Sequence, residues 1–227
     1  MALGLMKTDD NYVDKWVLEY LVPRRPELVA SFLEAREICD RVGRTKSLEA
    51  GDAERLLGFA RSPHTPLGEN VASMIGERYA KVPSLGTIIR ALAGGRLIHE
   101  RINALVALSS YPSTDLHSEL LAHLLRDKSA RIRELAADKI VDHGLTGLHT
   151  ELEAAVARES NPKILDALRS DIEYLRCGFH VRRAGEDVWV TFRQPRKGST
   201  SKLFTREEFD AEGSAWIQVM LTNEREA

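Results

Sequence analysis

Histidines are the residues of this chain whose chemistry suits metal binding or proton transfer. The seven histidines include two close pairs, His117 with His123 and His143 with His149, and the members of each pair are six residues apart. Two metal ligands on one face of a helix need a spacing of about four residues. Neither pair therefore predicts a metal site, and we expect these histidines to face solvent or to cap helices.

Other reactive groups are no better placed. Cys39 and Cys177 have no second cysteine or histidine at ligand spacing, so we expect two reduced thiols in the core. Gly94 and Gly95 lack the further glycines and the lysine of a phosphate-binding loop, and no serine lies in a Gly-x-Ser-x-Gly turn. The sequence predicts no catalytic residue, no cofactor and no metal, and we expect a protein that is not an enzyme.

A repeat of 32 residues organises the middle of the chain and must position whatever site exists. Aliphatic and small residues recur at this period in columns that lie four residues apart, which is the spacing of a buried helical stripe. A two-helix unit cannot bury both of its faces alone, so neighbouring units must stack into a solenoid. The four columns are Leu56, Ile88, Leu120, Leu152; Ala60, Leu92, Leu124, Val156; Ala72, Ala104, Ala136, Leu168; and Gly76, Leu108, Ile140, Ile172.

One unit carries a more specific pattern. Asp127 precedes the aliphatic-arginine pair Ile132 and Arg133, with Ala136 three residues beyond the arginine and Ile140 four residues further on. This unit resembles the first helix of a HEAT-like repeat of the short bacterial type, and the resemblance covers about residues 56–177. It implies a right-handed α-α superhelix and no particular activity.

Other parts of the sequence support the resemblance in one unit and depart from it in another. Arg101, Ala104 and Leu108 repeat the spacing one period earlier, whereas the unit that begins at Pro162 has Leu165 where the arginine would be. An ankyrin-like turn, Thr-Pro-Leu at residues 65–67, occurs once and is followed by glycine instead of histidine. We therefore favour HEAT-like repeats over ankyrin repeats.

The two ends differ from the repeats. Residues 12–22 and 26–42 have apolar positions at helical spacing and predict a helix pair that caps the solenoid. After Gly178 the pattern alternates: residues 180–192 predict a β-hairpin, 202–205 and 215–221 predict further strands, and 206–211 predict a turn or short helix. The predicted organisation is an N-terminal helical cap (1–50), HEAT-like repeats (51–177) and a small β-rich extension (178–227).

Composition limits the classes of partner. The net charge of −2 removes the strong electrostatic case for a nucleic acid or an acidic membrane. No apolar run approaches the length of about 18 residues that a membrane helix needs, and residues 1–10 lack a signal-peptide core. We expect a soluble cytoplasmic protein, and the excess of arginine over lysine tilts the expectation toward a bacterial host.

Charge is uneven in the C-terminal segment. Residues 176–206 contain eight basic and two acidic residues, and residues 207–227 contain six acidic residues and one basic residue. Two interpretations stay open: a patch that binds an anionic partner, or neutralisation of these cations by Glu207, Glu208, Asp210 and Glu212. The candidate patch consists of Trp189, Arg193, Arg196, Lys197 and Lys202.

The second helix of each unit would line the concave groove of a solenoid, where such proteins commonly bind their partners. The same period predicts the polar and aromatic side chains of that groove, and an ordinary solvated face is the alternative. The candidate groove residues are Arg55, Phe59, Arg90, Glu119, His123, Arg126, Glu151 and Arg158.

The function predicted from these observations is a non-catalytic scaffold that engages one protein partner, in the manner of a bacterial immunity or adaptor protein. The alternative is a nucleic-acid-binding protein similar in repeat type to the alkylpurine DNA glycosylases. Those enzymes need a basic groove with an aromatic residue and a carboxylate, which the mixed charges of the predicted groove do not supply.

Overall fold

The computed structural model describes residues 19, 21–110, 114–194 and 198–225 of the chain. It divides into two compact units, and the boundary lies between Leu120 and Leu121, within helix α8 (Asp115–Leu124). Each unit is described by itself below. The predicted three-part organisation, with boundaries at residues 50 and 177, stays a prediction.

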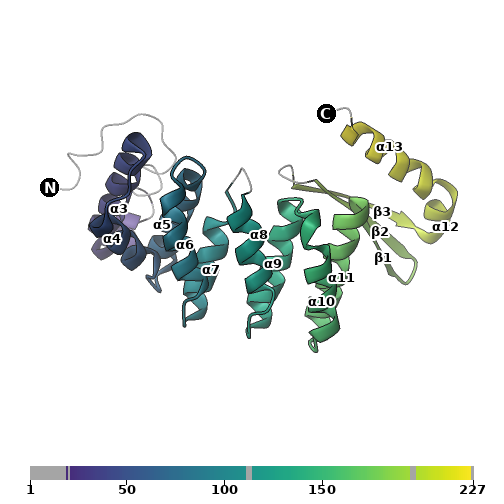
Figure 1. Ribbon diagram of the computed structural model, residues 1–227. Coiled ribbons are helices and arrows are strands. Elements are labelled where there is room, and N and C mark those ends of the chain that lie inside the picture. Colours follow the sequence, from purple (N-terminus) through teal and green to yellow (C-terminus); the bar gives the residue numbers. More distant parts are fainter. Residues whose placement is uncertain (1–18, 20, 111–113, 195–197, 226–227) are drawn as a thin grey trace. The chain divides into compact units, whose positions relative to one another are not determined.

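The first unit consists of helices connected by short turns (Figure 1). Helices α3, α5 and α7 contact one another in succession, and α4 contacts α6, so the helices of this unit form two layers. The elements are α2 (Val22–Arg24), α3 (Pro26–Thr45), α4 (Ala50–Ala60), α5 (Thr65–Tyr79), the 3-10 turn η3 (Pro83–Leu85), α6 (Gly86–Ala93), α7 (Ile98–Ala107) and the first part of α8.

The second unit combines helices with a small sheet. Helix α11 packs against α9 and α10, and the sheet follows α11 directly. The elements are the end of α8, α9 (Ala130–Asp142), η4 (Thr146–Leu148), α10 (His149–Arg158), α11 (Pro162–Cys177), β1 (Phe179–Ala184), β2 (Asp187–Gln194), β3 (Gly198–Thr205), α12 (Arg206–Glu208), the π-helical turn η5 (Phe209–Gly213) and α13 (Ser214–Arg225).

The mainly helical fold with a C-terminal antiparallel sheet confirms the predicted fold class, and the packing of helix on helix is consistent with a helical solenoid. The predicted columns account for the core. Of their 16 members, 14 are buried, and Val156 and Ile172 are half-buried. The right-handed sense of the superhelix and the HEAT-like family stay predictions.

A close approach of two helices explains why one column begins with Gly76, where the later units have Leu108, Ile140 and Ile172. A Cβ atom at Gly76 would collide with the backbone carbonyl of Ala107, at the place where α5 and α7 approach each other. The close approach of two backbones is a use for which glycine is suited. Larger side chains fill the corresponding position in the other units.

Two arginines brace the turns that precede their helices. Arg101 Nη1 donates to the backbone oxygens of Gly95 and Arg96 at 2.8 and 2.9 Å, and Arg133 Nη1 donates to Asp127 O at 2.9 Å. Arg101 and Arg133 are one period apart and make equivalent bonds. Free turn carbonyls need hydrogen-bond partners, so these arginines have a structural role that the repeat pattern reproduces.

The residue types at several helix ends explain where those helices begin or stop. The side chain of Asn161 accepts a hydrogen bond from the backbone N–H of Lys163 and caps α11. Gly144 comes directly after the C-cap residue of α9 and has φ 62°, the left-handed conformation that commonly ends a helix. The predicted helix at residues 26–42 is present as α3, although it runs on to Thr45. Most of the helix predicted at residues 12–22 lies outside the described residues.

The three strands form an antiparallel sheet in the order β1-β2-β3. The predicted hairpin is confirmed: β1 and β2 are joined by Gly185 and Glu186, and Gly185 has φ 63°, as a tight hairpin turn requires. The strand predicted at residues 202–205 is also present and begins earlier, at Gly198. The predicted turn or short helix at 206–211 is helical in α12 and η5.

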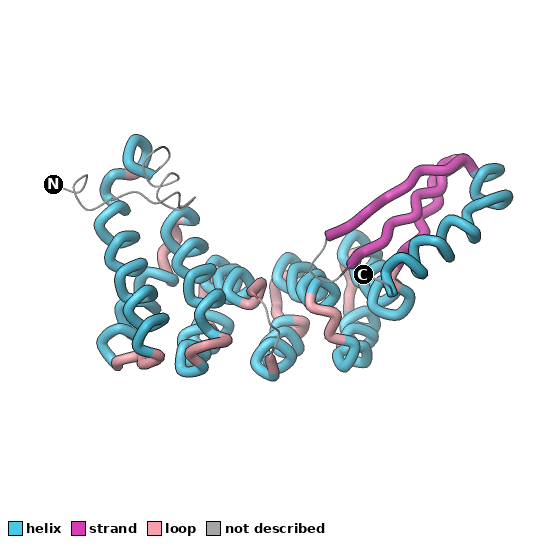
Figure 2. The backbone as a smooth tube through the Cα atoms, turned by 90° about the horizontal axis from the view of Figure 1, so that it is seen from above, coloured by secondary structure: helices cyan, strands magenta, loops and turns pink. Residues whose placement is uncertain are grey.

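The strand predicted at residues 215–221 is wrong, because this segment lies in helix α13. A strand would bury every second residue, yet Val219 is 56% exposed. The side chains that pack on the sheet are Ile217 and the half-buried Trp216, Met220 and Leu221, whose spacing defines one face of a helix. They cover the apolar face of the sheet formed by Val188, Val190, Phe192 and Phe204, and Figure 2 shows α13 beside the strands.

Leu124→Asp tests the predicted columns. Leu124 is 0% exposed, so an aspartate there would place an unpaired charge in the core and lower the free energy of unfolding by several kcal/mol, on the order of 3 or more. We expect a large fall of the melting temperature in calorimetry. His123→Asp, at the neighbouring exposed position, adds the same charge near the same helix end and should cost less than about 1 kcal/mol. Equal melting temperatures for the two variants would refute the assignment of this column.

Candidate functional site

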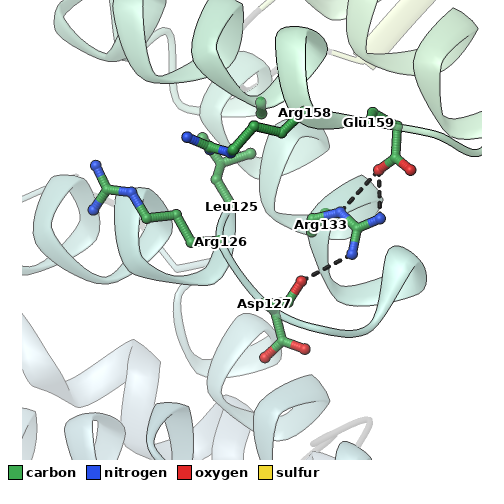
Figure 3. A pocket seen from close by; sticks show the side chains of 7 residues that line it. Leu125, Arg126, Asp127, Arg133, Arg158 and Glu159 are labelled. Atoms are coloured by element: carbon green, nitrogen blue, oxygen red, sulfur yellow. Dashed lines mark hydrogen bonds and ion pairs between the residues drawn. The ribbon is translucent and has the colours of Figure 1, made fainter.

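A hollow in the second unit lies where the ends of α8 and α10 meet the start of α9 (Figure 3). Its volume is about 410 Å³, within the range of ligand-binding pockets. Two residues of the predicted groove, Arg126 and Arg158, belong to its lining. The lining residues are Leu125, Arg126, Asp127, Arg133, Ala155, Arg158 and Glu159.

An ion pair between Arg133 and Glu159 forms one wall of the hollow. Arg133 Nε and Nη2 both donate to Glu159 Oε2, at 2.8 and 2.5 Å. The other carboxylate oxygen of Glu159 accepts from the backbone N–H groups of Ser160 and Asn161. The carboxylate of Glu159 thus has partners on both oxygens, and its side chain is 1% exposed.

These bonds determine the ionisation of Glu159. Burial alone would raise the pKa of this carboxyl, but the N–H donor of Asn161 and the Arg133 guanidinium outweigh burial and hold the pKa below its usual range. Glu159 is therefore a charged and occupied group at neutral pH. Asp127, the other acidic residue of the lining, accepts from the N–H of Ser129 at 2.7 Å.

Arg126 and Arg158 differ from the rest of the lining. Both are exposed, and neither forms an ion pair with another residue in the part of the chain that the structure describes. In Figure 3 the side chain of Arg158 extends toward the side where Arg126 lies, away from the pair formed by Arg133 and Glu159. A basic side chain near a helix C-terminus also stabilises the helix dipole, which is the structural explanation for an arginine here.

Comparison of the repeat units indicates that the fold does not need Arg126 and Arg158. At the period of 32 residues, Arg126 and Arg158 share a column with Ser62 and Gly94. Ser62 and Gly94 follow helices α4 and α6 in the first unit, so the same turn forms without a cation. Two guanidinium groups are therefore available in the hollow of the second unit without a structural requirement for their charge.

The other predicted groove residues are dispersed or already paired. Arg55 forms an ion pair with Glu34, and Arg90 binds Glu119 through two hydrogen bonds of 3.0 and 2.7 Å. The remaining three, Phe59, His123 and Glu151, are half-buried, exposed and half-buried respectively, and none of them lines the hollow.

The described residues of the predicted C-terminal patch have different surroundings and do not form one surface. Trp189 is 41% exposed, whereas Lys202 lies on the rings of Phe204 and Trp216, with Nζ 4.3 Å from the Phe204 centroid. Arg193 points to helices α9 and α11. Arg196 and Lys197 lie outside the described residues.

Arg193 is the centre of an ion-pair cluster within the second unit. Its Nη1 lies 3.0 Å from Asp138 Oδ1 and 3.2 Å from Asp171 Oδ1, and its Nη2 lies 2.9 Å from Asp142 Oδ1. The guanidinium also donates to the backbone oxygen of Asp138. One side chain from β2 thus joins the sheet to α9 and α11.

The cluster contains more negative than positive charge, and Asp171 is its most buried carboxyl. Burial and the neighbouring charge of Asp138 raise the pKa of Asp171 to about 7, against the opposing effect of Arg193. The carboxylates of Asp142 and Asp138 raise the pKa of Arg193 above its usual value despite burial. Arg193 therefore stays charged, while Asp171 holds its proton to a much higher pH than an exposed carboxyl does.

Sequence reasoning missed this cluster. The neutralising groups that it proposed for the cations of residues 176–206 were Glu207, Glu208, Asp210 and Glu212, whereas the ion pairs of Arg193 come from earlier helices. One signal was available: Asp138 and Asp142 are four residues apart and lie on one face of α9. Nothing in the sequence indicated which cation would face them.

A second hollow, in the first unit, was not predicted. It has a volume of about 350 Å³ and lies between the C-terminal ends of α3 and α5. Arg78 is paired with Asp40 at 2.5 Å, and Lys46 donates to the backbone oxygen of Gly43. The lining residues are Asp40, Gly43, Arg44, Lys46, Glu77, Arg78 and Lys81.

The cysteines and histidines that were considered for catalysis lie in the core or at the ends of helices. Burial raises the pKa of the Cys39 thiol to about 12, so this thiol stays protonated, and Cys177 is half-buried. His117 is buried and its Nδ1 accepts from the N–H of Thr114 at the start of α8, while the buried His143 is the C-cap residue of α9. Among the described residues, no group of three or more His, Cys, Asp or Glu side chains could hold a metal ion.

Comparison with known proteins leaves the family open. No protein-family model matches the chain, and neither the curated proteins nor the solved structures include a significant match. Within the described segments, none of the helices has the length and apolar character to cross a membrane.

Arg193→Ala should destabilise the second unit, because three carboxylates would lose their shared cation. We expect a loss of about 2–4 kcal/mol in the free energy of unfolding, measured by denaturant titration followed by tryptophan fluorescence. Arg182→Ala is the matched control, since Arg182 is an exposed arginine of the same sheet. A loss of equal size in both variants would show that the cluster does not hold the sheet.

Asp171→Asn tests the ionisation of the cluster. The pKa of Asp171 is about 7 in the folded protein and near 3.9 in an unfolded chain, so the folded protein holds this proton more tightly. The folded state therefore loses stability relative to the unfolded state as the pH rises from about 3.9 to about 7. Asparagine cannot ionise, so the melting temperature of the variant relative to the parent should rise between pH 5 and pH 8, by the equivalent of roughly 1–3 kcal/mol.

The control for this pH series is Asp166→Asn, at an exposed position of the same helix. Its melting temperature relative to the parent should not change across the same range. A constant difference for Asp171→Asn as well would contradict the raised pKa.

Proposed function

We propose that the protein is a non-catalytic binding scaffold that engages one protein partner through the hollow in its second unit. The observation that carries this proposal is the presence of two exposed cations, Arg126 and Arg158, in a hollow whose acidic side chains are already bonded. Arginine is enriched at the energetically important positions of protein interfaces.

The repeat architecture supports the same proposal. Stacked helical repeats present extended surfaces that commonly bind other proteins, and the turn column that contains Arg126 and Arg158 changes residue type while the buried columns stay apolar. The proposal includes a cytoplasmic immunity or adaptor role in a bacterium.

The charge distribution favours a protein over a nucleic acid. A surface that follows a phosphate backbone needs a run of uncommitted cations. Arg55 and Arg90, the predicted groove cations of the first unit, are paired with Glu34 and Glu119. Arg126 and Arg158 alone supply few contacts for a polyanion, whereas two arginines are enough to anchor a protein segment.

Charge reversal of the hollow tests the proposal. We expect a tagged copy, isolated gently from its source cell and measured by native mass spectrometry, to carry a stoichiometric protein companion that survives nuclease treatment. In the double variant Arg126→Glu with Arg158→Glu, the bound fraction should fall by about tenfold or more, because two attractive contacts become repulsive. The melting temperature should change little, since both side chains are exposed.

The matched control is Arg169→Glu with Arg182→Glu, which makes the same change of net charge at exposed positions outside the hollow. It should retain the companion. Loss of the associated mass after nuclease treatment would favour the nucleic-acid alternative, and full retention by the Arg126/Arg158 variant would place the binding surface elsewhere on the chain.

A further inference from the structure

We propose that the hollow between α8 and α10 binds side-chain carboxylates of an acidic segment in the partner chain. This inference rests on the proposed function and adds the chemistry of the ligand. The cations that would bind the carboxylates are Arg126 and Arg158, and the apolar wall beside them consists of Leu125 and Ala155.

Arginine suits this ligand because of its shape. A guanidinium presents its N–H donors in a planar fork that matches the two oxygens of a carboxylate, and such bidentate pairs are among the stronger hydrogen bonds in proteins. Arg133 already binds Glu159 through two of its donors. The hollow thus contains one completed arginine–carboxylate pair and two arginines with no carboxylate from the described residues.

The acidic residues of the lining do not compete for Arg126 and Arg158. Both oxygens of Glu159 are bonded, to Arg133 and to the N–H groups of Ser160 and Asn161. Asp127 accepts from the N–H of Ser129. Arg133 neutralises Glu159 and Asp127 keeps its charge, so the lining has three cations against two carboxylates, and Arg126 with Arg158 gives the hollow a net attraction for an anion.

The second hollow provides a contrast within the same chain. It also contains cations, but its lining includes Glu77, whose side chain is 62% exposed and lies 3.7 Å from Arg78. Four cations and two carboxylates line that hollow, so charge alone does not exclude an acidic ligand, but no apolar side chain lines it to hold a peptide. We therefore place the acidic segment in the second unit and expect little binding in the first.

The experiment uses the full chain and a defined probe, fluorescein-labelled hexaglutamate, with hexaglutamine that carries the same label as the control without side-chain carboxylates. Fluorescence anisotropy should detect hexaglutamate binding that weakens as NaCl rises from about 0.05 to about 0.5 M, since exposed charges are screened. Arg126→Glu with Arg158→Glu should weaken binding by about tenfold or more. Arg44→Glu with Lys81→Glu makes the same change of charge in the second hollow and should leave the affinity within about twofold of the parent.

Each outcome decides the inference. Loss that is confined to the Arg126/Arg158 charge-reversal variant supports it. Parent-like binding by Arg126→Lys with Arg158→Lys would also support it, and would show that positive charge suffices without the planar fork. Equal loss in both charge-reversal variants, or absence of hexaglutamate binding by the parent, overturns it. Tighter binding of a single-stranded oligonucleotide of equal charge would also overturn it, in favour of phosphate recognition.

The two proposals fail in different ways. A protein companion that remains on the parent chain in native mass spectrometry, together with no affinity for hexaglutamate, would leave the scaffold function standing and remove only the acidic ligand. Absence of any protein companion would remove the proposed function itself, whatever the peptide does.

Discussion

Burial of one aliphatic stripe per helix is the constraint on which the rest of the structure depends. A pair of short helices has two faces and little core of its own, so its stripe is covered only when the next pair packs on it. This requirement keeps residues such as Leu56, Leu92 and Ala136 apolar and fully buried. It places no such demand on the turn column that holds Ser62, Gly94, Arg126 and Arg158. The same repetition that makes the core uniform therefore leaves a row of positions open to any residue type.

The helical part of the fold could be predicted from the sequence because its determinants are local. Apolar residues at a spacing of three and four, with Asn161 and Gly144 at the ends, specify helices without knowledge of the neighbours. The C-terminal helix was mistaken for a strand because Trp216 to Leu221 is a short apolar run that fits both periods. Its conformation is decided by the sheet, whose apolar face needs a stripe of side chains as cover. That is a tertiary requirement, and a local pattern does not contain it.

The candidate site was predictable only in part, for a similar reason. Periodicity brought Arg126 and Arg158 into one column and so identified two cations of the hollow. It could not distinguish them from Arg55 and Arg90, whose partners Glu34 and Glu119 come from other helices. Arg193 looked like part of a basic surface because its acidic partners lie in α9 and α11. Whether a charged side chain is available depends on which opposite charge lies beside it, and this information is contained in the packing.

The order of synthesis gives the Arg193 cluster a consequence for folding. Asp138, Asp142 and Asp171 leave the ribosome before Arg193, which follows them by 55, 51 and 22 residues. Until β2 is made, α9 and α11 bring three acidic side chains together without their cation, so their pairing is opposed either by repulsion between carboxylates or by the cost of keeping Asp171 protonated. Completion of β2 removes that opposition. A strand that is translated later thus completes the ion pairs of a helix pair made earlier, and we expect docking of the sheet to strengthen the packing of α9 with α11.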